Sequence, residues 1–248
     1  MRMGDGPWTA VRDALASGAP VVAILPLGAV EAHGPHLPLT TDVVISDGMA
    51  ARAAALLEER DVRAFVLPAL AYAPAGYASE FAGTISIGAA AAKAVLLDIA
   101  RSLKGQGFAC LAFANSHFDP ANVAMLREAA AEIATLDLPV AFPDFTRRAL
   151  AGTLTAEFQS GACHAGQFET SLVLADRPEL VDATAGKALA DNPSSLVTAF
   201  AQGATTFTEA GGPGAYFGTP SQASAAEGEA SFGVMAAALA EAVLASLA

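Results

Sequence analysis

Two hydrophobic patterns alternate along the first 142 residues of the chain. Continuous apolar runs, as in strands that are buried on both faces, occupy residues 21–27, 63–70, 108–114 and 139–142. Between them, apolar residues at helical spacing predict helices over residues 42–60, 88–104 and 121–135, the second of which ends at Gly105. This alternation is typical of a mostly parallel β-sheet, so we predict an α/β fold of three layers with helices on both faces of the sheet.

The remaining sequence predicts no second domain. Residues 223–247 are rich in alanine and predict a terminal helix that docks on the sheet or on a neighbouring subunit. Two glycine-rich loops, residues 72–83 and 208–221, are candidates to border a site. Because no repeat, charged tail or linker divides the sequence, we expect residues 1–248 to form a single domain.

The composition and charge exclude several classes of protein. Apolar residue types make up 54% of the chain and charged types 15%, which indicates a compact globular protein. A formal net charge of −12 repels phosphate backbones, so we expect no nucleic-acid partner. The longest apolar stretch, residues 19–30, is interrupted by prolines and is shorter than the ~20 residues that cross a bilayer. We therefore expect no membrane span, and an N-terminus without a signal-like apolar region favours a cytoplasmic location.

All four histidines lie in segments that also carry acidic residues, amides or glycine. The first two follow the first predicted strand, the third follows the third predicted strand, and the last opens a predicted helix: His33, His36, His117 and His164. In sheets of this kind, the ends of the strands border the crevice that binds ligands. Glu31 and His33 are two residues apart and project to the same side of an extended backbone. The histidine segments therefore predict a site at this edge of the sheet.

The chemistry of these segments favours a metal site. Mixed histidine and carboxylate ligands suit zinc or manganese, whereas a set rich in thiolates would indicate structural zinc. A single histidine beside an acid is more often part of a structural network. Three such segments together favour a site for two ions, and the carboxylate of Asp42 is placed to bridge them.

Longer motifs in the same segments resemble the creatininase family of metal-dependent amidohydrolases. Residues 28–42 read G-A-V-E-A-H-G-P-H-L-P-L-T-T-D, where the family has a pattern close to G-x-x-E-Q-H-G-P-H-L-P-L-x-T-D. Residues 83–86 match the family's G-T-[IL]-S, and residues 164–171 match H-A-G-x-x-E-T-S. The resemblance covers nearly the whole chain. It implies a creatininase-like α/β fold, a binuclear metal site and a homo-oligomer, commonly a hexamer.

The resemblance also implies the ligands of two divalent ions per chain. Glu31, Asp42 and His117 correspond to the ligands of one ion. His33, Asp42 and Asp119 correspond to the ligands of the other, so that Asp42 bridges the pair. Zinc, manganese and iron all accept this set.

Two further residues have roles near these ions. Creatininase has a glutamate at the position of Asp119 and many relatives have no acid there, so Glu169 is an alternative ligand of the second ion. His164 corresponds to the family histidine that handles protons at the scissile bond. Glu169 also has two other interpretations: it orients a ligand or His164, or it stabilises the start of a helix.

The departures from the family pattern concern the substrate. Ala32 replaces the glutamine of E-Q-H, Ser116 replaces the glycine of N-G-H, and residues 118–120 replace a glycine-rich turn. Creatininase has tryptophans close to its substrate, but the one tryptophan of this chain is Trp8, far from every motif. We therefore do not expect creatinine itself to be the substrate.

The predicted function is hydrolysis of a non-peptide C–N bond in a small, possibly cyclic amide. Two ions about 3.5–4 Å apart lower the pKa of a shared water from 15.7 towards ~7 and supply the nucleophile. His164 is the candidate general acid that protonates the leaving nitrogen. Within the family, the alternatives are a metallopeptidase that trims a short precursor peptide, as in mycofactocin maturation, and a formamide deformylase.

Hypotheses of other classes stay open at this point. The altered turn at residues 118–120 is compatible with a degenerate subunit that binds metal or ligand without catalysis. Cys163 beside His164 suggests a thiol nucleophile, but the nearby candidate metal ligands explain the histidine better. A nucleotide-binding domain is disfavoured because the chain has neither a G-x-x-x-x-G-K-[ST] motif nor a strand-linked G-x-G-x-x-G motif.

Overall fold

A computed structural model describes residues 1–248 and contains one sheet of four parallel strands, in the order β2-β1-β3-β4. The strands are β1 (Val21–Leu27), β2 (Arg63–Val66), β3 (Cys110–Asn115) and β4 (Val140–Ala141). They lie where the apolar runs predicted them, but β2 and β4 are shorter than expected. Proline has no N–H to donate to a neighbouring strand, and prolines lie at positions 68, 139 and 143, close to the ends of these two strands.

Ten α-helices surround the sheet. The long ones are α2 (Thr41–Glu58), α3 (Ala89–Gln106), α4 (Pro120–Ala134) and α10 (Ala225–Leu247). The shorter ones are α1 (Trp8–Leu15), α5 (Arg148–Ala151), α6 (Ala156–Ser160), α7 (Gln167–Asp176), α8 (Ala183–Ala188) and α9 (Leu196–Ala201). The predicted stop of α3 at Gly105 is wrong by two residues. The helix continues through Gly105, and Gly107 caps it in the left-handed conformation, with a φ of 95°.

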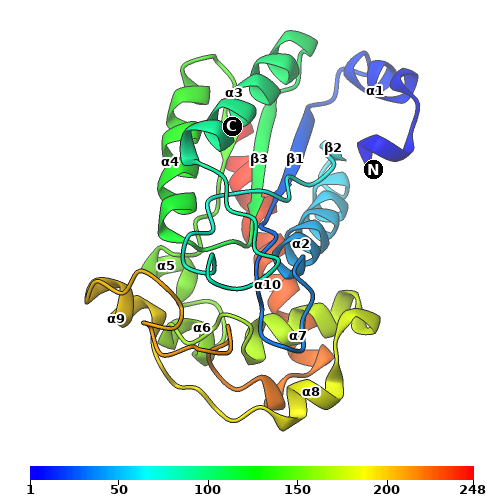
Figure 1. The fold of residues 1–248 in the computed structure, drawn as a ribbon. Coiled ribbons are helices and arrows are strands. Elements are labelled where there is room, and N and C mark those ends of the chain that lie inside the picture. The colour runs from blue at the N-terminus through cyan, green and yellow to red at the C-terminus, as the bar shows by residue number, and fades with distance from the viewer.

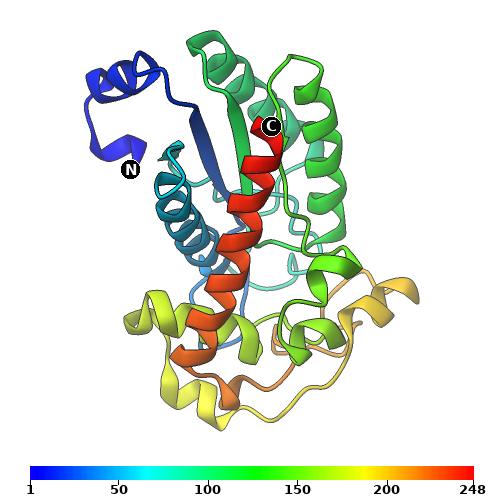
Figure 2. The same ribbon diagram turned by 180° about the vertical axis from the view of Figure 1, so that it is seen from behind.

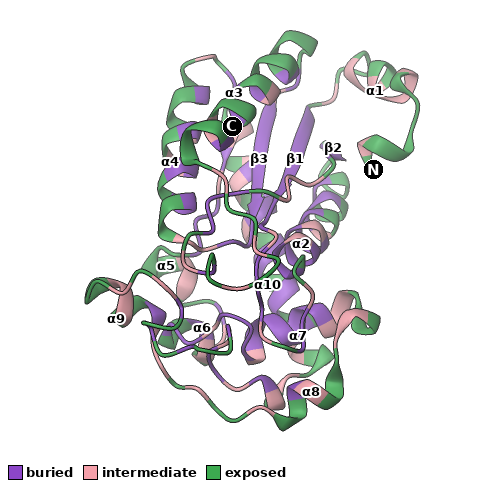
Figure 3. Ribbon diagram, viewed as in Figure 1, coloured by how far each residue is buried: buried purple, intermediate pink, exposed green.

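The helices form one layer on each face of the sheet, which confirms the predicted three-layer α/β fold (Figures 1 and 2). Successive side chains of β1 point to opposite faces. Val22 and Ile24 pack with α2, α7 and α10, whereas Val21 and Leu25 pack with α3 and α4. Figure 3 shows that β1 and β3 are buried along their whole length, as their unbroken apolar runs require.

Helix α10 is long and apolar enough to cross a membrane, judged by its length and composition alone. This feature was not predicted from the sequence. In this structure it lies beside α2 on the same face of the sheet, where it contacts β3 and β4 and packs against α7, as Figure 2 shows. Phe232, Met235 and Leu239 point into the core and are fully buried. Packing therefore accounts for the apolar residues on the buried face of α10, where 39% of its most apolar stretch of 18 residues is buried.

Residues 143–222 form a separate layer beyond the carboxyl ends of the strands (Figure 1). The layer consists of α5 to α9 and the loops between them. Its third helix, α7, connects this layer to the three-layer core because it packs against both α2 and α10. This arrangement covers the strand ends, where the histidine segments emerge.

Candidate metal centre

The segment that follows β1 turns back against the start of α2. Gly28 lies so close to this helix that a Cβ atom there would be 2.7 Å from the carbonyl carbon of Asp42, so a larger residue does not fit without a shift of the backbone. Ser116, at the end of β3, donates a hydrogen bond of 2.6 Å to the main-chain oxygen of Asp42. The serine that departs from the family motif therefore joins the ends of two strands to α2. Asp42 itself lies in the first turn of α2, where the helix dipole stabilises a carboxylate.

The third histidine segment is held by contacts at the start of α7. The side chain of Glu157 accepts hydrogen bonds from the main-chain nitrogens of Phe168, at 2.8 Å, and Thr219, at 2.7 Å. Ala165 has a left-handed φ of 51°, which is strained for a residue with a Cβ atom. This conformation directs its N–H to the carboxylate of Glu169, at 2.6 Å. The turn therefore fixes His164 and Glu169 relative to each other.

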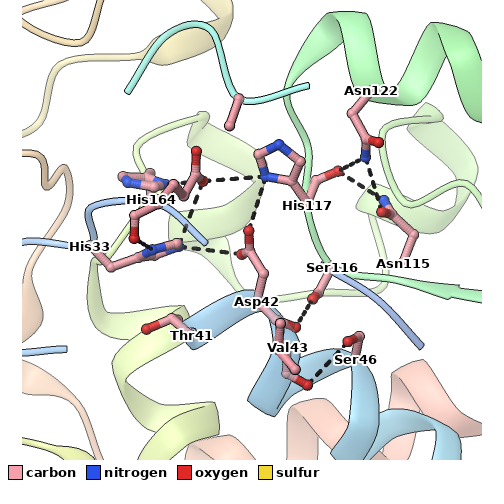
Figure 4. Close-up of polar contacts among 12 residues, drawn as sticks. His33, Thr41, Asp42, Val43, Ser46, Asn115, Ser116, His117, Asn122 and His164 are labelled. Carbon is pink, nitrogen blue, oxygen red and sulfur yellow. Dashed lines mark hydrogen bonds and ion pairs between the residues drawn. The ribbon is translucent and has the colours of Figure 1, made fainter. Parts of the chain in front are cut away.

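Three histidine rings are each oriented by a main-chain carbonyl, as Figure 4 shows in part. The contacts are His33 Nδ1 to the oxygen of Glu31 at 3.1 Å, His117 Nε2 to that of Pro74 at 2.7 Å, and His164 Nε2 to that of Ala32 at 2.9 Å. A carbonyl oxygen only accepts, so the ring nitrogen that faces it carries the hydrogen. In a neutral ring, the opposite nitrogen then has a free lone pair, which is the usual arrangement of a metal-binding histidine.

The opposite nitrogens all point at carboxylates. His33 Nε2 lies 3.3 Å from Asp42 Oδ1 and 3.5 Å from Glu169 Oε2. His117 Nδ1 lies 2.9 Å from Asp42 Oδ2 and 3.2 Å from Glu31 Oε1, and the latter oxygen is 3.8 Å from His164 Nδ1. All six side chains are more than nine-tenths buried. Three buried carboxylates and three imidazoles thus converge on one small volume.

The donor set fits divalent cations. No arginine or lysine pairs with the three carboxylates, and His33 Nε2 and Asp42 Oδ2 have no hydrogen-bond partner although both atoms are buried. Such orphaned atoms are rare in folded proteins unless a ligand satisfies them. The ligand atoms fall into three sets, each within 4.8 Å: Glu31, Asp42 and His117; His33, Asp42 and Glu169; and Glu31, His33 and His164. Asp42, Glu31 and His33 each belong to two sets. The two oxygens of Asp42 face different histidines, Oδ1 facing His33 and Oδ2 facing His117, as expected of a bridging carboxylate.

The cluster has an excess of negative charge, and this excess shifts the pKa values of its members. Burial by itself lowers the pKa of His33, but Asp42, Glu169 and Glu31 outweigh it and raise that pKa to about 10. Burial raises the pKa of Glu169 to about 8, with a further contribution from Asp42 and opposition from His33. Burial also opposes ionisation of Asp42, but His33 and His117 hold its pKa below the usual value. A cation among these groups would relieve the repulsion between the carboxylates.

One predicted site residue, Asp119, is placed differently from the others. Asp119 borders a cavity that opens over the cluster, but it is only half-buried and lies outside the three ligand sets. Its carboxylate caps α4 by accepting a 2.7 Å hydrogen bond from the nitrogen of Ala121. His164 lies within a ligand set, and burial, followed by the charge of His33, lowers its pKa well below the usual value. His36 lies outside the sets, and its Nε2 contacts Thr170 Oγ1 at 2.9 Å.

The groups that orient and enclose the cluster were not predicted from the sequence. The carbonyls of Ala32 and Pro74 have no signal in a sequence, because every residue has a carbonyl. Glu157 had no motif to identify it. Phe207, whose ring centroid is 4.3 Å from that of His164, lies one residue before the glycine-rich loop that we expected to border the site.

A cavity of about 50 Å³ opens over the cluster. Carboxylates and imidazoles form one side of it, and the aromatic side chains of Tyr77, Phe118, Phe200 and Phe207 form the other. Cys163 also borders the cavity, but burial raises the pKa of its thiol well above the usual value, which argues against a thiolate nucleophile. Fold and cluster together define an α/β protein with a candidate divalent-metal centre at the carboxyl ends of its strands.

Comparison with known proteins identifies the family. The creatininase family model, described as creatinine amidohydrolase, matches residues 5–243. A mycofactocin precursor peptide peptidase from Mycobacterium ulcerans (strain Agy99) is 32% identical over 220 residues, which are 86% of this chain and 80% of that protein. Creatinine amidohydrolase from Pseudomonas putida is 31% identical over 196 residues, 73% of each chain.

Solved structures agree with this result. A structure described as creatininase Mn superposes with a TM-score of 0.76 at 26% identity and covers 99% of this chain and 98% of its own. A creatininase variant described as the Zn–Zn type also has a TM-score of 0.76 at 26% identity, with coverage of 99% and 97%. The chain belongs to the creatininase family of hydrolases.

Proposed function

We propose that this chain hydrolyses amide C–N bonds with two divalent ions that share Asp42. The observation that carries the proposal is the anchoring of three histidines by main-chain carbonyls, which leaves each opposite nitrogen facing the buried carboxylates. One ion would be held by Glu31, Asp42 and His117, and the other by His33, Asp42 and Glu169. Glu169 thereby takes the place predicted for Asp119. Zinc and manganese suit these ligands and appear in the descriptions of the two creatininase structures.

In this proposal the ions and His164 have different roles in the reaction. When bound, the ions would supply a polarised carbonyl and a water of lowered pKa. His164 keeps its Nε2 hydrogen on the carbonyl of Ala32, so its Nδ1 faces the cluster with a free lone pair. We assign Nδ1 the transfer of a proton from the attacking water to the amide nitrogen, because an amine leaves readily only after protonation. The ring of Phe207 packs on His164 and shields it from bulk water.

The substrate we propose is a short peptide. The peptidase relative matches 86% of the chain, compared with 73% for the creatinine amidohydrolase. The cavity of about 50 Å³ is also small, since about 10–15 Å³ of volume measured in this way holds one water. It therefore suits the reacting group of a longer substrate better than a whole ring. The small non-peptide amide predicted from the sequence is the second candidate, favoured by the creatinine amidohydrolase relative.

Metal analysis combined with a hydrolysis assay tests this function. We expect about two ions per chain, loss of peptide hydrolysis after chelation, and recovery when zinc or manganese is restored. Creatinine and simple formamides serve as the non-peptide comparison in the same assay. Metal-loaded protein that cleaves no peptide or amide would contradict the proposal and favour the degenerate binding subunit.

Assembly into a hexamer and a cytoplasmic location stay predictions. Light scattering of the purified protein tests the first, and cell fractionation tests the second.

A further inference from the structure

A second hollow of about 590 Å³ lies beside the metal-centre cavity, and we call it the groove. It is bordered by the start of α4, by α5 and α6, and by α9, which lie next to one another in Figure 1. Its apolar lining includes Val123, Phe145, Phe158 and Val197. The volume is within the range of about 300–1,000 Å³ that is usual for ligand sites. The groove therefore has room for a substrate segment that the small cavity cannot hold.

The groove and the cavity share a boundary. Four side chains border both hollows: Phe118, Cys163, Leu196 and Phe200. A substrate whose amide reaches the metal centre across this boundary would therefore have its next residues in the groove. Val197, on the same short helix as Leu196 and Phe200, borders the groove and is 70% exposed. A ligand that covers this side chain would gain free energy, because apolar surface would be removed from water.

The charges of the groove are opposite to those of the protein as a whole. The chain has a net charge of −12, yet the groove is bordered by two arginines and by no acidic residue. Arg127 is already neutralised, because its guanidinium donates to Asp144 at 2.6 and 2.8 Å. Arg148 is exposed and forms no ion pair. The groove thus offers one free cation beside an apolar surface.

We propose that the groove binds the leaving-group side of a peptide substrate, with an apolar or aromatic side chain against Val197 and the C-terminal carboxylate at Arg148. This inference rests on the proposed amide hydrolysis. In that reaction, water gives its oxygen to the acyl carbon, the C–N bond breaks, and the amine that leaves with the added proton is the segment held in the groove. A guanidinium suits a carboxylate because its N–H groups match the two oxygens. The protein would accordingly cleave peptides near a free C-terminus.

A matched pair of peptides tests the inference. The probe is acetylated glycyl-phenylalanyl-leucine with a free carboxylate, and its partner is the same peptide ending in a carboxamide. We expect the metal-loaded protein to cleave the acid with the lower KM. Arg148→Gln should raise the KM for the acid about fivefold with little change in kcat, and should leave the amide unchanged, as expected of an ion pair at an exposed site. Val197→Asp should raise the KM for both peptides, because it replaces the apolar contact of the substrate side chain with a charged group.

Control variants separate the groove from general surface effects. Arg101→Gln removes an exposed arginine from α3, and Val95→Asp changes an exposed valine on the same helix, far from the groove residues in sequence and outside its lining. Neither should alter the preference for the acid. Equal KM values for acid and amide in the unmodified protein, or unchanged values in both groove variants, would overturn the inference.

A binding measurement distinguishes failure of the groove from failure of the proposed function. Calorimetric titration with the dipeptide phenylalanyl-leucine reports on the groove without hydrolysis. Binding that weakens in Arg148→Gln, in a protein that cleaves no amide, would support the groove and contradict the hydrolase. Cleavage with no dependence on Arg148 or Val197 in either measurement would support the hydrolase and reject the groove.

Discussion

Two hydrogen-bonded networks of this protein contain buried acids, and the partners of these acids differ. The carboxylate of Asp144 accepts from the nitrogen and the hydroxyl of Thr146 and from the guanidinium groups of Arg127 and Arg147. Burial opposes its ionisation, but the hydrogen bonds from Thr146 and the charge of Arg127 lower its pKa. In the metal centre, three carboxylates converge with no arginine or lysine, and two buried polar atoms have no partner.

The difference shows how a buried acid that stabilises the fold can be distinguished from one that binds a cation. Around Asp144, the protein itself supplies the positive charge, so the network is complete without a ligand. Around Asp42, the protein supplies lone pairs and negative charge and leaves the positive charge to be provided from outside. The two networks therefore predict opposite responses to substitution and to metal.

The largest expected effect is that of Asp42→Ala. Removal of the shared ligand should reduce the metal content from about two ions to less than one and lower amide hydrolysis by at least about 10³-fold, because both polarisation and water activation depend on the ions. Elemental analysis and a single-turnover assay measure the two effects. Full metal content in the variant would rule out a bridging role for Asp42.

A pair of variants sharpens the assignment of the second ion. Glu169→Gln should leave about one ion per chain, because Glu169 belongs to the set with His33 and Asp42. Asp119→Ala should retain both ions and lose only about 1 kcal/mol of stability, as expected for loss of a helix N-cap. The reverse result, with loss of an ion only in Asp119→Ala, would restore the ligand set that the family resemblance implied.

Asp144→Ala tests the other network. We expect the free energy of unfolding to fall by about 2 kcal/mol, because Arg127 loses its partner but is exposed enough to be hydrated. Metal content should not change. Urea titration gives the stability, and a parallel metal analysis serves as the control. A loss of bound ions in this variant would show that the two networks are coupled.

The smallest expected effect concerns pH and His36. Burial, with a contribution from the charge of His33, lowers the pKa of His36 to about 4, against 6.5 for an unperturbed histidine. Between these values the unfolded chain binds a proton that the folded protein does not, so stability falls as the pH decreases from 6.5 towards 4. This pKa difference sets an upper limit of about 2 kcal/mol on the loss of stability between pH 7 and pH 5, and screening of the charge reduces the expected loss to less than about 1 kcal/mol. Urea titrations at both pH values should show a smaller loss in His36→Gln, and an identical loss would exclude His36 as the source.

The fold was largely predictable because the hydrophobic patterns of its strands and long helices are local and regular. Strands β1 and β3 are buried on both faces, so their apolar runs are unbroken and mark their positions within one or two residues. The helices that cover the sheet show a period of 3.6 residues. Of the short helices α5 to α9, we predicted only α7, from the motif that begins at His164. The other four are too short to show such a period.

The candidate site was predictable only where a side chain supplies the chemistry. Glu31, His33, Asp42 and His117 lie together as the motif implied. Glu169 could be predicted only as an alternative to Asp119, because its position beside His33 and Asp42 depends on the left-handed turn at Ala165. The groove could not be predicted, because its lining comes from four helices spread over residues 118–200.

The anchoring of the histidines by main-chain carbonyls also has an evolutionary consequence. A carbonyl is the same whichever side chain its residue carries, so mutation at position 32 or 74 leaves the hydrogen bond to the ring in place. Alanine in place of the family glutamine at position 32 illustrates this tolerance. New substrate preferences can therefore arise by drift in the surrounding side chains while the tautomers of the histidines are inherited unchanged. Libraries for directed evolution can randomise positions 32 and 74 first.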